Sequence, residues 1–144
     1  MKKVYLDTNI LLDYFNSERA YHNEARQLVY YLLTNNIQIV FSEDMISTLV
    51  YILKKTNIDM MQFYNYLSKI TLDPKILICS FSGSVIRSAC QMCQSYNDDF
   101  EDYLQYFCAE KENCCAIYSM DKKFPNLKIP VKRYGEIDIH CCFE

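Results

Sequence analysis

The chain has 144 residues, of which 51% are hydrophobic, so we expect a single domain over residues 1–144 that buries about 68–70% of its unfolded surface. This composition, without a low-complexity tract, excludes an intrinsically disordered chain. The formal charge of −3 argues against a surface that attracts nucleic acid by charge alone, because phosphate binding depends on clustered Lys and Arg.

Apolar segments alternate between strand and helix spacing along the chain, beginning with a strand from Lys3 to Leu6. This strand runs into Asp7, Thr8 and Asn9, and Thr8 or Asn9 can cap the helix that follows, from Ile10 to Phe15. The further expected helices cover 18–34, 43–55, 59–70, 84–96 and 97–113, and the further expected strands cover 37–41, 76–79, 115–118 and 129–131. Parallel strands need crossover connections, so this order predicts an α/β fold: a three-layer α/β/α sandwich with a mainly parallel sheet of about five strands.

Acidic residues from distant parts of the sequence follow the expected strands. Asp7 comes directly after the first strand, and Asp121 comes shortly after the fourth. Asp99 and Asp102 lie three residues apart at the start of the helix before the fourth strand, which places them on one helix face. Because the functional crevice of an open α/β sheet lies beyond the carboxyl ends of its strands, we expect these carboxylates to meet there.

Such a cluster of carboxylates favours a divalent cation. Two negative charges about 4 Å apart repel by about 4 kcal/mol at an effective dielectric near 20, so three or four of them are costly without a neutralising ion. Mg²⁺ and Mn²⁺ prefer oxygen ligands and can activate water against a phosphodiester. The alternative for each single aspartate is a helix cap.

Four segments of the sequence resemble the PIN-domain family. The run from Val4 to Asp13 is similar to the family's opening strand, which ends in Asp-Thr-Asn. The run from Asp99 to Tyr106 resembles the second acidic motif, and the run from Ile117 to Phe124 resembles the third. The Ile-Pro-Val segment at residues 129–131 is similar to the family's last strand. In this order and spacing, the resemblance spans residues 2–133.

The resemblance implies a metal-dependent endoribonuclease that hydrolyses RNA with Mg²⁺ or Mn²⁺. It implies that Asp7, Asp102 and Asp121 are the metal-coordinating catalytic acids and that Asp99 is a nearby metal ligand, with Asn9 or Ser119 in support. Small bacterial members of the family are commonly VapC-type toxins of type II toxin–antitoxin pairs. The resemblance therefore also implies an antitoxin partner and a homodimer, and the lack of a signal peptide predicts a cytoplasmic location.

One position departs from the family pattern. The family carries a glutamate in the middle of the helix after the second strand, and the corresponding residue here is Thr48. Asp44 lies one helical turn earlier and can reach the same cleft, whereas Glu43 points about 140° away. Three possibilities follow: Asp44 compensates, the site is a reduced triad that binds metal more weakly, or the domain is a catalytically inactive PIN-like module that binds RNA or protein.

A phosphatase of the haloacid-dehalogenase kind is an alternative enzyme class, because it also begins with a strand that ends in aspartate. That class requires a second aspartate two residues later, and this position is Asn9. Asparagine cannot transfer the proton, so the sequence disfavours this class.

The chain contains eight cysteines, which we interpret as reduced thiols because no signal peptide precedes them. We also expect no membrane insertion. Cys90 and Cys93 are spaced like half a zinc site, and His140, Cys141 and Cys142 could add ligands, but helical core spacing favours a structural role.

The remaining surface signals concern tyrosines and lysines. We expect Tyr30 and Tyr31, and Tyr64 with Tyr66, to lie in the core or on a dimer surface. Lys122 and Lys123 adjoin Asp121 and are candidates for phosphate contact.

Overall fold

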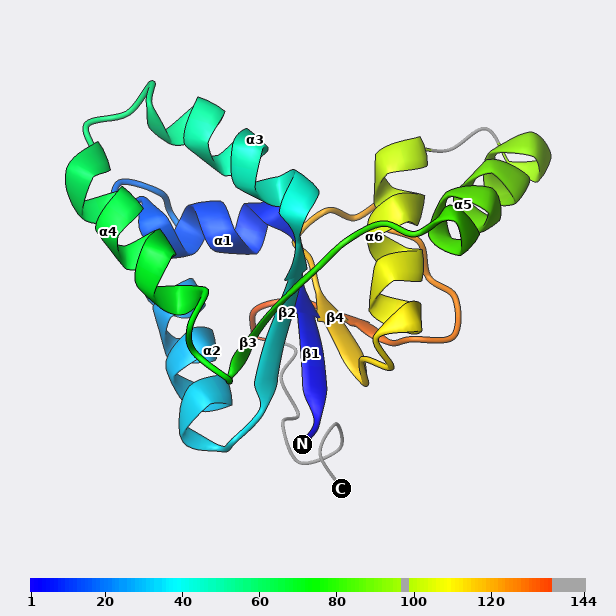
Figure 1. Ribbon diagram of the computed structural model, residues 1–144, viewed down its shortest axis with the longest axis horizontal. Helices are drawn as coiled ribbons and strands as arrows, with labels where there is room; N and C mark the ends of the chain where they lie inside the picture. Colours follow the sequence, from blue (N-terminus) through cyan, green and yellow to red (C-terminus); the bar gives the residue numbers. More distant parts are fainter. Residues whose placement is uncertain (97–98, 136–144) are drawn as a thin grey trace.

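The computed structural model describes residues 1–96 and 99–135. Its centre is a parallel five-stranded sheet with the strand order β3-β2-β1-β4-β5 (Figure 1). The strands are β1 (Lys3–Leu6), β2 (Gln38–Ser42), β3 (Ile76–Cys79), β4 (Ala116–Tyr118) and β5 (Val131–Lys132). The predicted α/β class and the parallel sheet are confirmed.

Helices cover both faces of the sheet, as a parallel sheet requires. Figure 1 shows one helical layer made of α1 (Thr8–Phe15), α2 (His22–Thr34), α3 (Glu43–Leu53) and α4 (Met60–Ile70). The other layer contains α6 (Phe100–Lys111), with α5 (Gly83–Ser95) packed against it. The expected three-layer sandwich is therefore present.

The register of the central strands brings the ends of β1 and β4 together. Leu6 pairs with Tyr118 across the two parallel strands, and the Asp7 amide donates to the Tyr118 carbonyl at 3.0 Å. The residues that follow these two strands, Asp7 and Ser119, consequently lie at the same edge of the sheet.

Two asparagines in the left-handed region end α2 and α6. Asn36 and Asn113 have φ values of 58° and 59°, a conformation that asparagine adopts more readily than most residues. After each, the next amide bonds back into the helix: Ile37 to the Leu32 carbonyl and Cys114 to the Ala109 carbonyl. The predicted stop at Asn35 and Asn36 is confirmed.

Two of the element boundaries that differ from the prediction have a clear physical cause. Helix α2 begins at His22 rather than at residue 18, since residues 16–21 form a turn in which Arg19 pairs with the buried Asp13 at 2.6 Å. Strand β5 is only Val131–Lys132, because Pro130 has no amide hydrogen to donate to a ladder. The expected helix start at Asn97 and Asp98 lies outside the described residues.

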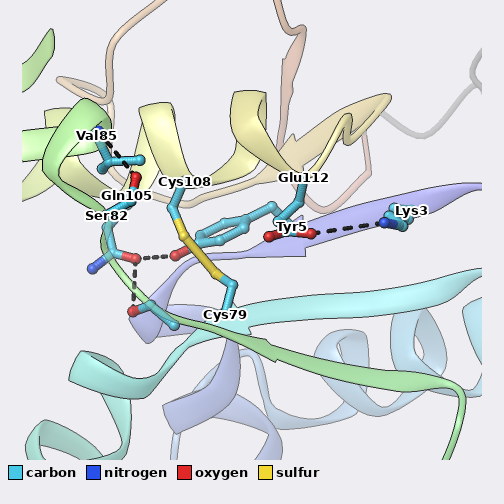
Figure 2. Close-up of a disulfide and its surroundings, with 9 residues drawn as sticks. Lys3, Tyr5, Cys79, Ser82, Val85, Gln105, Cys108 and Glu112 are labelled. Atoms are coloured by element: carbon cyan, nitrogen blue, oxygen red, sulfur yellow. Dashed lines mark hydrogen bonds and ion pairs between the residues drawn. A yellow bond between two sulfur atoms is a disulfide. The ribbon is translucent and has the colours of Figure 1, made fainter.

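The expectation of reduced cysteines is wrong for one pair. A disulfide joins Cys79, at the end of β3, to Cys108 in α6 (Figure 2). The two cysteines are 29 residues apart in sequence, and only the packing of α6 over the sheet brings them together. Cys90 is a free, exposed cysteine and Cys114 is a free, buried one, while Cys93 and Cys115 are partly buried. The segment His140 to Cys142 lies outside the described residues.

Among the described residues, no helix combines the length and the apolar character that a membrane span requires.

Candidate active site

Asp7 occupies the point where β1 ends and α1 begins. Its side chain, not that of Thr8 or Asn9, caps α1: Oδ1 accepts a hydrogen bond from the Thr8 amide at 2.8 Å. Only 6% of the residue is exposed. Burial is the main cause that raises the pKa of Asp7, and the charges of Asp121 and Asp99 raise it further. A carboxylate at this place is therefore costly without a compensating cation.

Ser119 joins Asp7 to Asp121 at the ends of β1 and β4. The fully buried Ser119 donates from Oγ to Asp7 Oδ2 at 2.8 Å. The same Oγ accepts from the Asp121 amide at 3.1 Å. Ser119 thus orients the Asp7 carboxylate and holds the backbone of Asp121 beside it.

We expect Ser119→Ala to lower the free energy of unfolding by about 1–3 kcal/mol, because it leaves a buried carboxylate oxygen and an amide without their partner. The Ser119 hydrogen bond lowers the pKa of Asp7, so the variant should also raise that pKa. Urea denaturation and carboxyl-carbon NMR titration measure the two effects. A variant with unchanged stability and an unchanged Asp7 titration contradicts this role.

The start of α6 brings a second group of acids to the same edge. Asp99 caps α6 by accepting from the Glu101 amide at 2.9 Å, and Asp102 lies half-buried in the first turn. The pKa of Asp102 is raised to about 7, first by burial and then by the charges of Asp99, Asp7 and Asp121. The charges of Asp99 and Asp121 therefore reach both Asp7 and Asp102.

The donor set at this edge fits a hard divalent cation. Its ligating atoms are carboxylate oxygens, which Mg²⁺ and Mn²⁺ prefer, and the neighbouring negative charges raise the pKa of Asp7 and of Asp102, as uncompensated charges do. Within residues 1–96 and 99–135, however, no three Asp, Glu, His or Cys side chains are arranged closely enough to enclose an ion. Binding an ion therefore requires the side chains to move closer together, which the half-exposed Asp102 and Asp121 can do.

The other predicted site residues occupy different surroundings. Asn9 is exposed in the first turn of α1, and Thr48 is half-buried in the middle of α3. Asp44 is exposed in the first turn of α3. Its charge raises the pKa of Glu101. Asp44 therefore approaches, from the opposite helical layer, the edge of the sheet that carries Asp7, Asp99, Asp102 and Asp121, which we call the acidic edge.

Glu101 is the acid that the sequence reasoning missed. Its pKa is raised by partial burial and then by the charges of Asp44, Asp99 and Asp7. Glu101 was part of the motif from Asp99 to Tyr106, but helical spacing does not place it on the face shared by Asp99 and Asp102. Only the approach of α3 reveals that it belongs to the same acidic edge.

A parallel α/β sheet with buried and half-buried carboxylates beyond the carboxyl ends of its strands has potential metal ligands in the crevice where open α/β folds carry their sites. A model of the PIN domain matches residues 3–123 of this sequence. The chain therefore belongs to the PIN-domain family.

Relatives and solved structures agree with this assignment. The chain is 31% identical over 137 residues to Ribonuclease VapC1 of Aquifex aeolicus. The alignment covers 90% of this chain and 89% of the relative. Its fold is similar to VapC20 of Mycobacterium tuberculosis, a sarcin-ricin loop cleaving toxin, with a TM-score of 0.65, 14% identity, and coverage of 84% of this chain and 92% of that one. It is also similar to VapBC2 of Rickettsia felis, with a TM-score of 0.67, 20% identity, and coverage of 92% of this chain and 98% of that one.

Proposed function

We propose that this protein is a metal-dependent endoribonuclease that hydrolyses RNA phosphodiester bonds and acts as the toxin of a type II toxin–antitoxin pair. The observation that carries the proposal is that Asp7, Asp102 and Asp121 come together at one edge of the sheet, where the charge of Asp121 raises the pKa of Asp7 and the charges of Asp7 and Asp121 raise the pKa of Asp102. The relative that covers most of the chain is named a ribonuclease. An RNA substrate would place the activity in the cytoplasm.

In this proposal Asp7, Asp102 and Asp121 hold the metal, with Asp99 beside them, and the ion is Mg²⁺ or Mn²⁺. Such an ion supplies charge neutralisation and an activated water when it is bound. Ser119 and the Thr8 amide orient the two oxygens of Asp7, so this carboxylate needs little reorganisation. PIN-domain ribonucleases generally need a divalent metal.

Lys122 and Lys123 are exposed and directly follow Asp121 in the sequence. They are the basic residues nearest in sequence to the acids of this edge. The Lys123 amide donates to Asp121 Oδ1 at 2.9 Å, which keeps the start of this segment beside the acids. We propose that the two lysines contact the RNA backbone, since a chain with a net charge of −3 needs a local basic rim to receive phosphate.

The test is a cleavage assay on a structured RNA with the metal-free protein and added Mn²⁺ or Mg²⁺. The proposal expects cleavage with either ion, no cleavage with a chelator present, and a rise in melting temperature when Mn²⁺ is added. Cleavage that persists in excess chelator contradicts the metal requirement. Mn²⁺ binding without cleavage of any RNA supports the inactive module instead.

Thr48 is the observation that favours an inactive module, because its hydroxyl cannot replace the charge of a glutamate. Asp44, one turn earlier in α3, and Glu101, in α6, supply carboxylates that lie close enough for their charges to interact. We therefore propose that the site functions without a carboxylate at position 48 and that these two acids compensate.

Thr48→Glu is expected to tighten Mn²⁺ binding by about tenfold, the usual scale for a residue that supports metal ligands. The added carboxylate would also lower the stability of the metal-free protein through repulsion. Calorimetric titration with Mn²⁺ measures the first effect. An unchanged affinity would show that position 48 does not face the ion, and Ser47→Glu, at an exposed neighbouring position, is the matched control.

The partner expected for such a toxin is an antitoxin protein. Solved structures with a similar fold include a toxin–antitoxin complex from Klebsiella pneumoniae. We propose that this chain also binds an antitoxin and that it forms a homodimer. Expression together with the product of the neighbouring reading frame tests the first proposal: a stable complex that suppresses RNA cleavage supports it, and independent elution of two unassociated proteins contradicts it.

A further inference from the structure

A small polar network lies inside the hydrophobic core, directly below the acidic edge. It consists of Tyr5 from β1, Ser42 from the end of β2, and Gln105 from α6, and at most 1% of any of them is exposed. Gln105 Oε1 accepts hydrogen bonds from the Tyr5 hydroxyl and from Ser42 Oγ, the latter at 3.2 Å (Figure 2). We call this set the Tyr5–Gln105–Ser42 network.

The network uses polar groups where apolar side chains would fill the space equally well. Ser42 holds the N-cap position of α3, yet its hydroxyl forms no capping bond and points to Gln105 instead. The Tyr5 hydroxyl donates to Gln105 from the strand that leads directly into Asp7.

Each member of the network lies at a short, fixed offset from an acid. Tyr5 precedes Asp7 by two residues on an extended segment, which puts both on one side of the chain. Gln105 follows Asp102 by three residues on one face of α6. Ser42 immediately precedes the helical turn that contains Asp44. The hydrogen bonds among these three residues therefore join three elements that each carry or adjoin an acid.

Gln105 is also left with an unused donor. Its Nε2 is buried and has no hydrogen-bond partner among the described residues, and Figure 2 shows this nitrogen turned away from Tyr5. Buried polar atoms are nearly always paired. Because one polar atom of Gln105 is unpaired, an amide is an unfavourable side chain here if it only fills the core. The carbonyl side of Gln105 is what the neighbouring β1 and β2 engage.

We propose that Gln105 is a positioning residue for the metal site. Through the Tyr5–Gln105–Ser42 network it ties α6 to the ends of β1 and β2, and this tie sets the approach of Asp102 to Asp7 and hence the affinity for the divalent cation. The inference rests on the proposed nuclease function and adds a residue that does not itself touch the ion.

The Cys79–Cys108 disulfide offers a second tie between α6 and the sheet. Cys108 follows Gln105 by three residues on the same helix, and Cys79 ends β3. The disulfide joins α6 to β3, whereas the network joins it to β1 and β2, next to Asp7. The effect of Gln105 should therefore persist when the disulfide is reduced.

The test is a Mn²⁺ titration of the full chain, followed by the electron paramagnetic resonance signal of free Mn²⁺ and carried out well below the melting temperature of each variant. Gln105→Met removes the amide at similar volume, and Tyr5→Phe removes only a hydroxyl. Each is expected to weaken Mn²⁺ binding by about tenfold. The double variant should be hardly weaker than either single variant, because the two residues act through one link. RNA cleavage should recover at saturating Mn²⁺.

Tyr106→Phe is the matched control, since it removes a hydroxyl from an equally buried tyrosine of the same helix. That hydroxyl accepts from the Lys128 and Ile129 amides, so its loss should lower stability and leave the Mn²⁺ affinity unchanged. If Gln105→Met does not fold, Tyr5→Phe decides the question by the same measurement.

Folded variants of Gln105 and Tyr5 with unaltered Mn²⁺ affinity would overturn the positioning role and leave the nuclease proposal intact. A loss of affinity as large in Tyr106→Phe would overturn it too, because the effect would then be general loosening. Failure of the unaltered protein to bind Mn²⁺ would overturn both proposals. Each titration is repeated with a thiol reductant, and an effect confined to the oxidised protein counts against the network.

Discussion

Asp102→Asn is expected to reduce RNA cleavage by about 10²–10³-fold, the usual loss when one group that stabilises developing charge is removed. The substitution keeps the size of the side chain and removes a charge that lies beside Asp99, Asp7 and Asp121. Because this charge is uncompensated in the metal-free protein, the variant should melt at the same or a higher temperature. Initial rates on a structured RNA and thermal melting measure the two effects.

The control for Asp102→Asn is the same substitution at a helix cap away from the site. Asp59 caps α4 by accepting from the Met61 and Gln62 amides, and asparagine is about as good a cap as aspartate. Asp59→Asn should leave cleavage and stability nearly unchanged. An Asp102→Asn protein that cleaves RNA at the normal rate would remove Asp102 from the site, whatever its stability.

The metal-free protein is expected to lose stability as the pH rises from about 4 to about 7. The pKa of Asp102 is about 7 in the folded protein and 3.8 in the reference state, so over this range the folded protein binds more protons than the unfolded chain. The contribution of Asp102 to the free energy of unfolding is fully present below its pKa in the unfolded chain, and it is lost as the pH rises through its pKa in the folded protein. After discounting for the half-exposed position of Asp102, the loss is about 1–2 kcal/mol.

Urea denaturation with a chelator at several pH values measures this loss. Asp102→Asn should flatten the pH profile of the free energy of unfolding, whereas Asp59→Asn should retain it. Protons compete with the cation for the same oxygens, so Mn²⁺ should raise the melting temperature more at pH values above about 7 than at about 5. Stability that increases with pH through this range in the metal-free protein would contradict the assigned environment of Asp102.

Much of the fold was predictable because its elements carry local patterns. The strand from Lys3 to Leu6 is a short apolar run that ends in a polar turn, and the structure has it with the same bounds. The predicted strand at residues 76–79 also appears unchanged. Asn35 and Asn36 end their helix as predicted, since a left-handed asparagine is a local property of the chain. Strands alternating with helices then leave few arrangements other than a parallel sheet.

The predictions that failed concern side-chain contacts that residue spacing does not reveal. Cys79 meets Cys108 only because α6 packs over the end of β3, and helix α2 begins late because Arg19 turns back to Asp13. Glu101 joins the acidic edge only because α3 brings Asp44 toward it. None of these contacts leaves a trace in the spacing of neighbouring residues.

The sequence by itself determined which elements form, their order, and which acids follow the strands, because strand and helix periodicity and turn chemistry act over a few residues. Only the tertiary structure decided how those acids are oriented and what lies beneath them. Tyr5 and Gln105 are 100 residues apart, and their hydrogen bond depends on the packing of a helix against a sheet. Such packing is set by the whole core at once, so its consequences for charge and for metal affinity appear only when the chain is folded.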